Sequence, residues 1–307
     1  MKVFSSVTQA QSEGLFRGAA VALGNFDGVH LGHQALIRRA QSKGRATAFT
    51  FAPHPGKVLR PELAPKLIVS EARKLELLAA TGLEALLMQT FSTDYAATTP
   101  ADFAAVLFEQ LQVGTVVVGH DFTYGAKRAG TVDTLKGRAA ALGRTVEVVE
   151  SVTVDGVVVS SSRIREYVLE GRVEAASSLL GRPFDLEGVV VKGQARGRTL
   201  GFPTANVDSA NEIKPASGVY AVRARIDGEQ SWWGGAANIG VKPTFGGSEA
   251  TIEVHLFDVA RDLYGKTLRV MFLARLRGER RFASVAELTA QIARDVDEAR
   301  TLCAKAP

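Results

Sequence analysis

The sequence predicts two domains: an α/β domain built on a parallel sheet, followed by an antiparallel β-barrel with a C-terminal helix. The first of three supporting observations is length, because 307 residues exceed one average domain. Up to about residue 150, short apolar runs alternate with amphipathic helical segments, which is typical of a parallel sheet with helices on its faces. Beyond residue 183, strand-like runs follow one another without helices, as in a barrel. We therefore predict domains over residues 1–181 and 182–307.

The first domain is expected to open with a buried strand and a helix. Residues 19–23 form an apolar run of the kind that fills a strand buried on both faces. After it, Leu36, Ile37 and Ala40 recur at helical spacing, and Gly44 follows where a left-handed C-terminal cap is expected. Further strands are predicted at residues 46–51, 84–88 and 115–118.

A second helix and a hairpin complete this domain. Thr99 is the expected N-cap of a helix that runs to about Leu111, with Pro100 at its first position and an apolar stripe that faces the core. Residues 152–160 are predicted to form a hairpin that turns at Asp155-Gly156. Two helices up to about residue 180 then carry the chain out of the domain.

Five strand-like runs predict the barrel, and they span residues 186–192, 218–226, 231–239, 250–259 and 267–276. Asp227-Gly228 joins one pair and is a strong hairpin signal. Ser284 and Glu287 form a capping box at the start of the last helix. The apolar stripe of that helix, which we expect to lie on the barrel, consists of Val285, Leu288, Ile292, Val296 and Leu302.

Composition limits the possible partners. With 46% hydrophobic and 22% charged residues, the chain is ordinary for a globular protein, and no apolar run approaches the ~20 residues that cross a bilayer. The N-terminus lacks the pattern of a signal peptide, and a lone Cys303 fits a reducing compartment, so we expect a cytoplasmic protein without a membrane partner. The net charge of +5 indicates anionic partners, and scattered basic residues favour small phosphates such as ATP over nucleic acid.

The stretch with the clearest chemistry is residues 24–33, GNFDGVHLGH, on a turn from strand to helix. Its glycines let backbone N–H groups approach an anion closely, and the first helical turn supplies unpaired donors and the positive end of the helix dipole. His30 and His33 are three residues apart and project from one side of that turn. A Gly-rich loop whose histidines merely cap or pack is the alternative interpretation.

This stretch resembles the His-x-Gly-His signature of the nucleotidylyltransferase superfamily, in the form typical of bacterial FAD synthetases. The resemblance implies a Rossmann-like sheet and a site in which His30 and His33 bind the ATP phosphates. There they stabilise the charge that develops at the α-phosphate as pyrophosphate leaves. It also implies nucleotide contacts at Gly24, Phe26, Asp27, Gly28 and Gly32.

Two other loops follow directly on predicted strands. His54, in residues 52–56, lies between two prolines and is expected in an extended, exposed geometry, either as a solvated loop residue or as part of a ligand site. Residues 119–130 combine an acid, two aromatic residues, glycines and two cations. They resemble a site loop of the FAD synthetases, which implies flavin or nucleotide contacts at Asp121 and Tyr124.

Residues 160–165, SSSRIR, are on their own an N-cap followed by two surface arginines. They also resemble the second nucleotide motif of the same family, Ile-Ser-Ser-Thr-x-Ile-Arg. The resemblance implies that Ser161, Ser162 and Arg165 hold the triphosphate. Val159 stands in place of Ile and Ser162 in place of Thr, and both replacements keep the chemistry.

A second candidate site lies in residues 193–206, GQARGRTLGFPTAN. Gly193, Gly197 and Gly201, together with two arginines, can wrap phosphates, although a Gly/Arg-rich loop is more often only a loop. Thr204 and Asn206 are two residues apart, so in an extended segment their side-chain oxygens face the same way and can share one Mg²⁺. The GFPTAN string resembles the flavokinase signature, in which the threonine and asparagine coordinate magnesium and the nucleotide phosphates.

Residues 251–256, TIEVHL, alternate so that Glu253 and His255 share one face of a strand. Taken alone, this is a strand with one core face and one wet face. The flavokinase resemblance implies that Glu253 is the catalytic carboxylate, because that family carries its glutamate on the strand after a segment like residues 240–245, GVKPTF. Residues 276–282, LRGERRF, resemble its flavin-side loop, with Phe282 available to the ring system.

Together the resemblances cover nearly the whole chain, in the order of the bifunctional bacterial riboflavin kinase/FMN adenylyltransferases. They imply that riboflavin is phosphorylated to FMN by the second domain, a β-barrel flavokinase, and that FMN is adenylylated to FAD by the first, with ATP as co-substrate and Mg²⁺ as cofactor. Three alternatives remain: a different acceptor for adenylyl transfer, a flavin or nucleotide binder without turnover, and an RNA-binding protein. The sequence identifies no protein partner.

Overall fold

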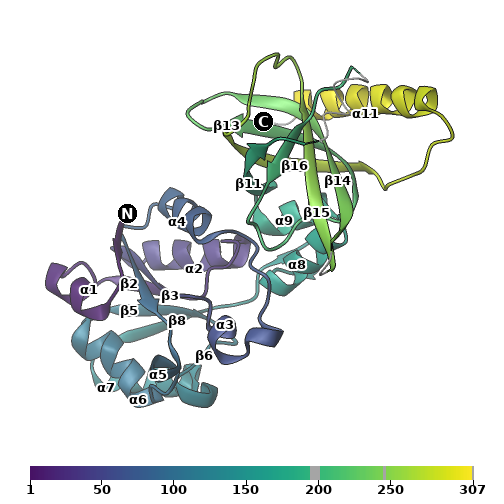
Figure 1. Cartoon of the computed structure of the whole chain (residues 1–307). Coiled ribbons are helices and arrows are strands. Elements are labelled where there is room, and N and C mark those ends of the chain that lie inside the picture. Colours follow the sequence, from purple (N-terminus) through teal and green to yellow (C-terminus); the bar gives the residue numbers. More distant parts are fainter. Residues whose placement is uncertain (194–200, 245–246, 306–307) are drawn as a thin grey trace. The chain divides into compact units, whose positions relative to one another are not determined.

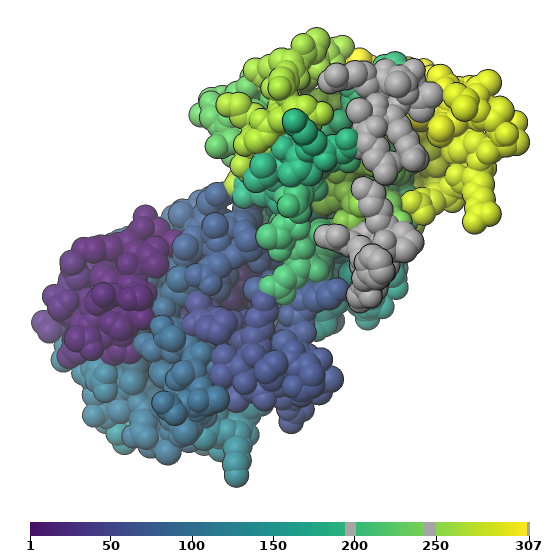
Figure 2. Space-filling view, in the orientation of Figure 1, coloured from purple at the N-terminus to yellow at the C-terminus, as the bar shows by residue number. Residues whose placement is uncertain are grey.

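The computed structural model describes residues 1–193, 201–244 and 247–305 (Figure 2, in which the remaining residues are grey). The chain forms two compact units. The first, called the sheet unit here, comprises Met1–Lys66 and Glu71–Ser160, and the second, called the barrel unit, comprises Leu67–Ser70 and Ser161–Pro307. A six-stranded parallel sheet and a closed antiparallel barrel organise these two units, which confirms the predicted fold.

The six strands of the main sheet are all parallel and lie in the order β1-β4-β3-β2-β5-β8. They comprise β1 (Lys2–Phe4), β4 (Ala85–Thr90), β3 (Ala46–Ala52), β2 (Ala20–Leu23), β5 (Thr115–Gly119) and β8 (Thr145–Val149). From β2 the chain moves to β3 on one side, and β5 later joins β2 on the other side. The carboxyl ends of β2 and β5 therefore flank a topological switch point, where open α/β sheets bind ligands.

Helices cover both faces of this sheet (Figure 1). One face carries α2 (Leu31–Gln41) and α4 (Glu71–Ala80), whose apolar side chains pack against β2, β3 and β4. The other face carries α1 (Val7–Glu13), α6 (Pro100–Ala105) and α7 (Val132–Ala141). α6 starts at the predicted N-cap and passes into a single π-helical segment at Val106–Gln110. Two short helices, α3 (Pro55–Leu59) and α5 (Thr93–Ala96), follow β3 and β4.

The barrel unit closes through six strands in the order β11-β12-β15-β14-β13-β16. They are β11 (Phe184–Val191), β12 (Ala205–Asp208), β13 (Gly218–Ile226), β14 (Trp232–Thr244), β15 (Gly247–Leu256) and β16 (Thr267–Arg277). β12 was not among the five expected strands, although closure depends on its pairing with β11 and β15. Two helices of this unit, α8 (Ser161–Leu169) and α9 (Val173–Leu180), precede β11. The last element is α11 (Val285–Lys305).

Local predictions had mixed outcomes. The turn at Asp155-Gly156 is confirmed, since both residues are left-handed and join β9 (Thr153–Val154) to β10 (Val157–Val158). Gly44 is not a helix cap, because α2 already ends at Gln41 with a right-handed Ser42 as its cap. In α11, Val296 and Leu302 pack on the barrel as expected, whereas Val285 is 66% exposed. Among the helices of the described ranges, none is long and apolar enough to cross a membrane.

Candidate functional sites

The loop from Gly24 to His30 joins β2 to α2 in an uncommon backbone conformation. Phe26, Gly28 and Val29 have φ values of 52°, 82° and 45°, all in the left-handed region. A β-branched residue such as Val29 adopts that region only when its surroundings enforce it. The enforcement here is burial, because the side chains of Phe26 and Val29 are enclosed in the core between the sheet and α2. Folding itself therefore fixes the path of this loop.

His30 and His33 form a stacked pair at the start of α2. His30 is the N-cap, and its Nδ1 accepts a hydrogen bond from the His33 backbone N–H at 3.3 Å. The ring centroids are 3.6 Å apart and the planes differ by 16°. Gly32 leaves room for this arrangement, since a Cβ there would lie 3.1 Å from the His30 ring. Both rings lie on one side of the first turn, as their spacing predicts.

The environment of this pair keeps His33 uncharged. Its Nδ1 is buried and has no hydrogen-bond partner within the described part of the chain, and its ring packs edge-on against Phe26. Burial, then His30, then the Lys74 ammonium lower the pKa of His33 well below its usual value. His30 accepts at Nδ1, so a neutral His30 carries its proton on Nε2. His33 therefore offers a neutral imidazole to a ligand, and the pair does not present two positive charges.

Lys74, on α4, was missed by the sequence reasoning. Its Nζ donates to the carbonyl oxygen of Phe51 at 3.4 Å, near the carboxyl end of β3. Burial lowers the pKa of Lys74, while the carboxylates of Glu71 and Asp27 oppose this shift. A signal was available: Lys74 precedes the fully buried Leu78 by four residues and therefore shares its inward side of the helix.

The segment after β3 also differs from expectation. His54 is half-buried, so the predicted exposure is wrong, although its backbone, with φ −55° and ψ 132°, is extended. It is the N-cap of α3, where its Nδ1 accepts from the Gly56 N–H at 3.1 Å. Next to this segment, the rings of Phe51, Phe91 and Tyr95 have centroids 5.4 to 5.9 Å apart. The Tyr95 hydroxyl is buried without a partner within the described ranges, and burial raises the pKa of Tyr95. No sequence motif identified this aromatic cluster.

Asp121 and Tyr124 follow β5 but have different surroundings. β5 pairs with β2, so this loop and the histidine loop leave neighbouring strands at the same sheet edge. Asp121 is exposed. Tyr124 is buried in the core, stacks on Phe122 and shares a 3.2 Å hydrogen bond with the hydroxyl of Thr134. A ligand can therefore reach the Asp121 side chain directly, whereas the Tyr124 ring is held in the core.

The serine and arginine motif lies in the first turns of α8, within the barrel unit. Ser161 opens the helix, Ser162 is exposed and Arg165 is half-buried. Arg163 pairs with Glu166 at 2.5 Å, whereas the buried Ile164 anchors the helix between the two arginines. Arg163 is thus an exposed, ion-paired residue, whereas Arg165 is less exposed.

In the barrel unit, the pairing register brings together two of the predicted kinase residues. Asn206 on β12 lies directly opposite Glu253 on β15. On its other side Glu253 faces Asn238 of β14, so the carboxylate stands between two amides. Opposite residues in an antiparallel pair have Cβ atoms about 5 Å apart. Asn206 and Glu253 can therefore act on one ligand.

Neighbouring residues hold this arrangement in place. The Nδ1 of His255 is 2.8 Å from the carbonyl oxygen of Pro203, which ties the residue before Thr204 to β15. Gly193 lies against Asn206, and a Cβ at Gly193 would be 2.1 Å from the Asn206 amide nitrogen. Glycine is thus the residue that this contact permits. Gly201 is exposed and left-handed, and Gly197 lies outside the described residues.

The loop between β16 and α11 is tied down by a buried ion pair. Arg277 donates from Nε and Nη2 to the carboxylate of Asp295, at 2.8 to 3.1 Å, and Gln291 donates to the same carboxylate. Phe282 is half-buried beneath the Arg280 guanidinium, 4.6 Å from the ring centroid. The Oε1 of Glu279 would lie 3.5 Å from a Cβ at Gly240, whose strand partner is Thr251. The loop therefore reaches the strands that carry Glu253.

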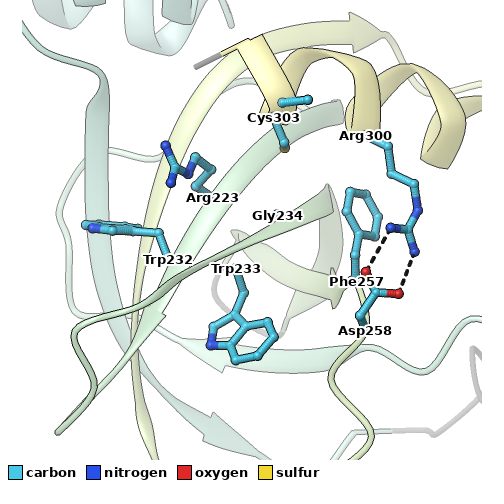
Figure 3. A pocket seen from close by; sticks show the side chains of 9 residues that line it. Arg223, Trp232, Trp233, Gly234, Phe257, Asp258, Arg300 and Cys303 are labelled. Carbon is cyan, nitrogen blue, oxygen red and sulfur yellow. Dashed lines mark hydrogen bonds and ion pairs between the residues drawn. The ribbon is translucent and has the colours of Figure 1, made fainter. Parts of the chain in front are cut away.

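A cavity of about 270 Å³ lies where the C-terminal end of α11 meets β13 and β14 (Figure 3). Its lining includes Arg223, Trp232, Trp233, Phe257, the ion-paired Asp258 and Arg300, and Cys303. Because Gly234 has no side chain, Cys303 and Phe257 can approach it closely. None of the predicted kinase residues of the described ranges lines this cavity, so it is separate from the kinase site.

Comparisons with known proteins agree with this geometry. Residues 13–163 match the FAD synthetase family and residues 180–303 the riboflavin kinase family. The bifunctional riboflavin kinase/FMN adenylyltransferase of Escherichia coli K12 is 39% identical over 96% of this chain and 95% of its own. The chain belongs to this family of bifunctional enzymes. The riboflavin kinase/FMN adenylyltransferase of Bacillus subtilis is 42% identical over 92% of this chain and 91% of its own.

One solved structure resembles the whole bifunctional chain. It is a crystal structure named as a macrolide-efflux protein from Streptococcus pneumoniae, with a TM-score of 0.89 and 34% identity over 98% of this chain and 99% of that one. A known structure therefore has the same order of domains along its chain, with the part that corresponds to the FAD synthetase match first and the part that corresponds to the riboflavin kinase match second.

Proposed function

We propose that the chain carries out two ATP-dependent transfers on flavins. The barrel unit phosphorylates riboflavin to FMN, and the sheet unit adenylylates FMN to FAD and releases pyrophosphate. The supporting observation is that each matched family covers the part of the chain whose geometry suits its reaction. The stacked histidines lie within the FAD synthetase match, and the Asn206–Glu253 pair lies within the riboflavin kinase match.

In adenylyl transfer, the FMN phosphate attacks the α-phosphorus of ATP in line, and the bond to pyrophosphate breaks. His30 and His33 donate N–H bonds to phosphate oxygens and stabilise the charge that develops there. Other phosphate oxygens accept hydrogen bonds from backbone N–H groups of the histidine loop and of α2, at Phe26, Asp27, Gly28 and Gly32. The Gly24 N–H already donates to the carbonyl oxygen of Phe49 at 3.3 Å.

In phosphorylation, Glu253 accepts the proton of the terminal ribityl hydroxyl as that oxygen attacks the γ-phosphorus and ADP leaves. Asn206, opposite on β12, holds the phosphates close to this hydroxyl. We also assign Gly193 and Gly201 to the nucleotide. Because Gly193 has no side chain, the Asn206 amide can keep its position.

Thr204 and Asn206 suit a magnesium ion. They supply hydroxyl and amide oxygens, and Mg²⁺ usually binds few protein ligands together with substrate phosphates. Within the described ranges, no group of three or more His, Cys, Asp and Glu residues can hold a metal, so a site completed by ATP is the arrangement that fits. When bound, Mg²⁺ neutralises phosphate charge at the transferred group.

The flavin rings need apolar surfaces. We assign Phe282 to the riboflavin site and Asp121 to the FMN site, with the buried Tyr124 supporting the Asp121 loop from the core. The cluster of Phe51, Phe91 and Tyr95 offers a further surface, with a buried hydroxyl that lacks a protein partner within the described ranges.

From the lone Cys303 we also infer a cytoplasmic enzyme.

The central experiment is incubation of the purified chain with riboflavin and Mg-ATP, followed by chromatographic separation of FMN and FAD. Both products are expected, and FMN is expected to appear first. The same assay tests the proposed boundary between residues 181 and 182: a fragment of residues 180–307 should make FMN and no FAD. Absence of FMN from the full chain would contradict the kinase assignment.

A further inference from the structure

Lys74 is placed by two elements of the sheet unit at the edge that carries the histidine pair. α4, which bears Lys74, covers the same face of the sheet as α2, which bears His33. The Lys74 ammonium contacts the carbonyl oxygen of Phe51, the residue before the last one of β3. β3 is the direct neighbour of β2, whose carboxyl end leads into the histidine loop. Lys74 and His33 therefore lie on the same face of the sheet, and the Lys74 ammonium is close enough to lower the pKa of His33.

Charge is distributed unequally over these groups. His33 is neutral at pH 7, and the stacked rings cannot both hold a proton without strong repulsion at 3.6 Å. A nucleoside triphosphate carries several negative charges, which a pair with a neutral His33 balances poorly. Lys74 is the ammonium whose charge reaches His33 and Asp27. Lys74 therefore places a positive charge beside His33.

The ammonium of Lys74 also has unused hydrogen-bonding capacity. It has three N–H groups, of which one makes a long 3.4 Å bond to a carbonyl oxygen. Within the described part of the chain it makes no closer hydrogen bond or ion pair. Burial of a charge with so few partners is unfavourable unless a ligand supplies acceptors. Phosphoryl oxygens are suitable acceptors, because bonds between an ammonium and a phosphate are charge-assisted.

We propose that Lys74 is a phosphate-binding residue of the adenylyl-transfer site, whose ammonium contacts phosphoryl oxygens of ATP or of FMN. This proposal rests on the assignment of adenylyl transfer to the His30 and His33 loop. The competing role is structural: Lys74 would only connect α4 to β3 through Phe51. The two roles differ in what they require, since the structural role needs a donor and phosphate binding needs a positive charge.

Steady-state formation of FAD from supplied FMN in the full chain separates these roles. Lys74→Gln keeps a donor for Phe51 but removes the charge, and Lys74→Arg keeps the charge. We expect Lys74→Gln to lower kcat/KM at least tenfold and Lys74→Arg to remain within about threefold of the original chain. Lys136→Gln, at an exposed position of α7, is the matched control and should change nothing. Riboflavin phosphorylation by the same samples should be unaffected.

Two further measurements identify the phosphate and test the premise. A rise in the inhibition constant of pyrophosphate assigns the contact to ATP, and a rise confined to the KM of FMN assigns it to the FMN phosphate. If Lys74→Gln retains adenylylation within twofold while His33→Ala loses it, the Lys74 proposal is wrong and the site assignment stands. If His33→Ala is also normal, the site assignment itself fails. Equal losses in Lys74→Gln and Lys74→Arg would support the structural role and overturn the proposal.

Discussion

Asn206 and Glu253 face each other across the antiparallel pair of β12 and β15. This register places a neutral oxygen donor and a carboxylate side by side on one surface of the barrel. Proton acceptance and phosphate positioning are thus assigned to two adjacent strands of one rigid sheet. Rigid support matters, because a displacement of about 1 Å from the productive geometry can cost about a hundredfold in rate.

Glu253→Gln should selectively remove the kinase reaction. The substitution keeps the size and one acceptor oxygen but removes the basic carboxylate, and general-base assistance is worth about 100- to 10,000-fold. FMN formation should fall by about that factor, whereas adenylylation of supplied FMN should persist. Glu298→Gln, on the exposed side of α11, is the matched control. Kinase turnover equal to that of the original chain would end the assignment of Glu253 as the base.

His33→Ala should have the opposite selectivity. Removal of one preorganised donor to a phosphate costs on the order of 3 kcal/mol, or about a hundredfold in rate. FAD formation from FMN should fall accordingly, and riboflavin phosphorylation should stay nearly intact. Both half-reactions are measured on the same sample. Equal loss of both activities would mean that His33 is needed for folding and not specifically for adenylyl transfer.

The neutral state of His33 also predicts a pH dependence of stability. The folded pKa of His33 lies below the unfolded value of about 6.5, so between those two pH values the unfolded chain binds the extra proton. The contribution of a neutral His33 is complete above pH 6.5 and is lost as the pH falls toward the lowered pKa. Urea unfolding followed by circular dichroism, from pH 8 to pH 5, should show a larger loss in the original chain than in His33→Gln. Parallel curves would contradict the neutral assignment.

Gly193→Ala should impair the kinase through Asn206. A Cβ at Gly193 would lie 2.1 to 2.5 Å from three atoms of the Asn206 amide, so the amide must move. We expect a decrease of about a hundredfold in FMN formation, with adenylylation unchanged. The control is Gly137→Ala in α7, where a Cβ would meet nothing within 4 Å. Normal kinase activity in Gly193→Ala would show that Asn206 need not hold its observed position.

Asp295→Ala should destabilise the barrel unit. Asp295 is 4% exposed, and its removal leaves the partly buried Arg277 guanidinium without its carboxylate. Breaking a buried pair in this way costs about 3 kcal/mol or more. Both tryptophans of the chain, Trp232 and Trp233, lie in the barrel, so tryptophan fluorescence during urea unfolding reports this unit alone. Asp297→Ala, at an exposed neighbouring position, should change the free energy of unfolding by less than about 0.5 kcal/mol.

Much of the fold followed from patterns that the sequence displays locally. Buried parallel strands such as residues 20–23 are continuous apolar runs, and the turn at Asp155-Gly156 needs residues that tolerate positive φ. β12 was missed because four residues, ANVD, are too few to establish a period of two. The exposed Val285 fits the helical spacing of its stripe, but it is the first residue of α11, and the apolar α11 residues that pack with the barrel begin at Val296.

The candidate sites show a similar division. Motifs located the histidine pair, Asn206 and Glu253, because these residues stand in fixed local strings. Lys74 and Tyr95 belong to no string, and their importance arises from burial beside residues that are distant in the sequence. Tyr124 shows the reverse case, since it lies in a motif-like loop while its ring fills the core. Tertiary packing decides such positions, and local spacing cannot report it.

The left-handed backbone at Phe26, Gly28 and Val29 has a consequence for the thermodynamics of nucleotide binding. A loop that folds around its ligand loses conformational entropy at that moment, and affinity falls accordingly. Here the buried side chains of Phe26 and Val29 impose this order when the sheet unit folds. Nucleotide binding then restricts mainly the nucleotide itself, so its calorimetric entropy should contain little contribution from the loop.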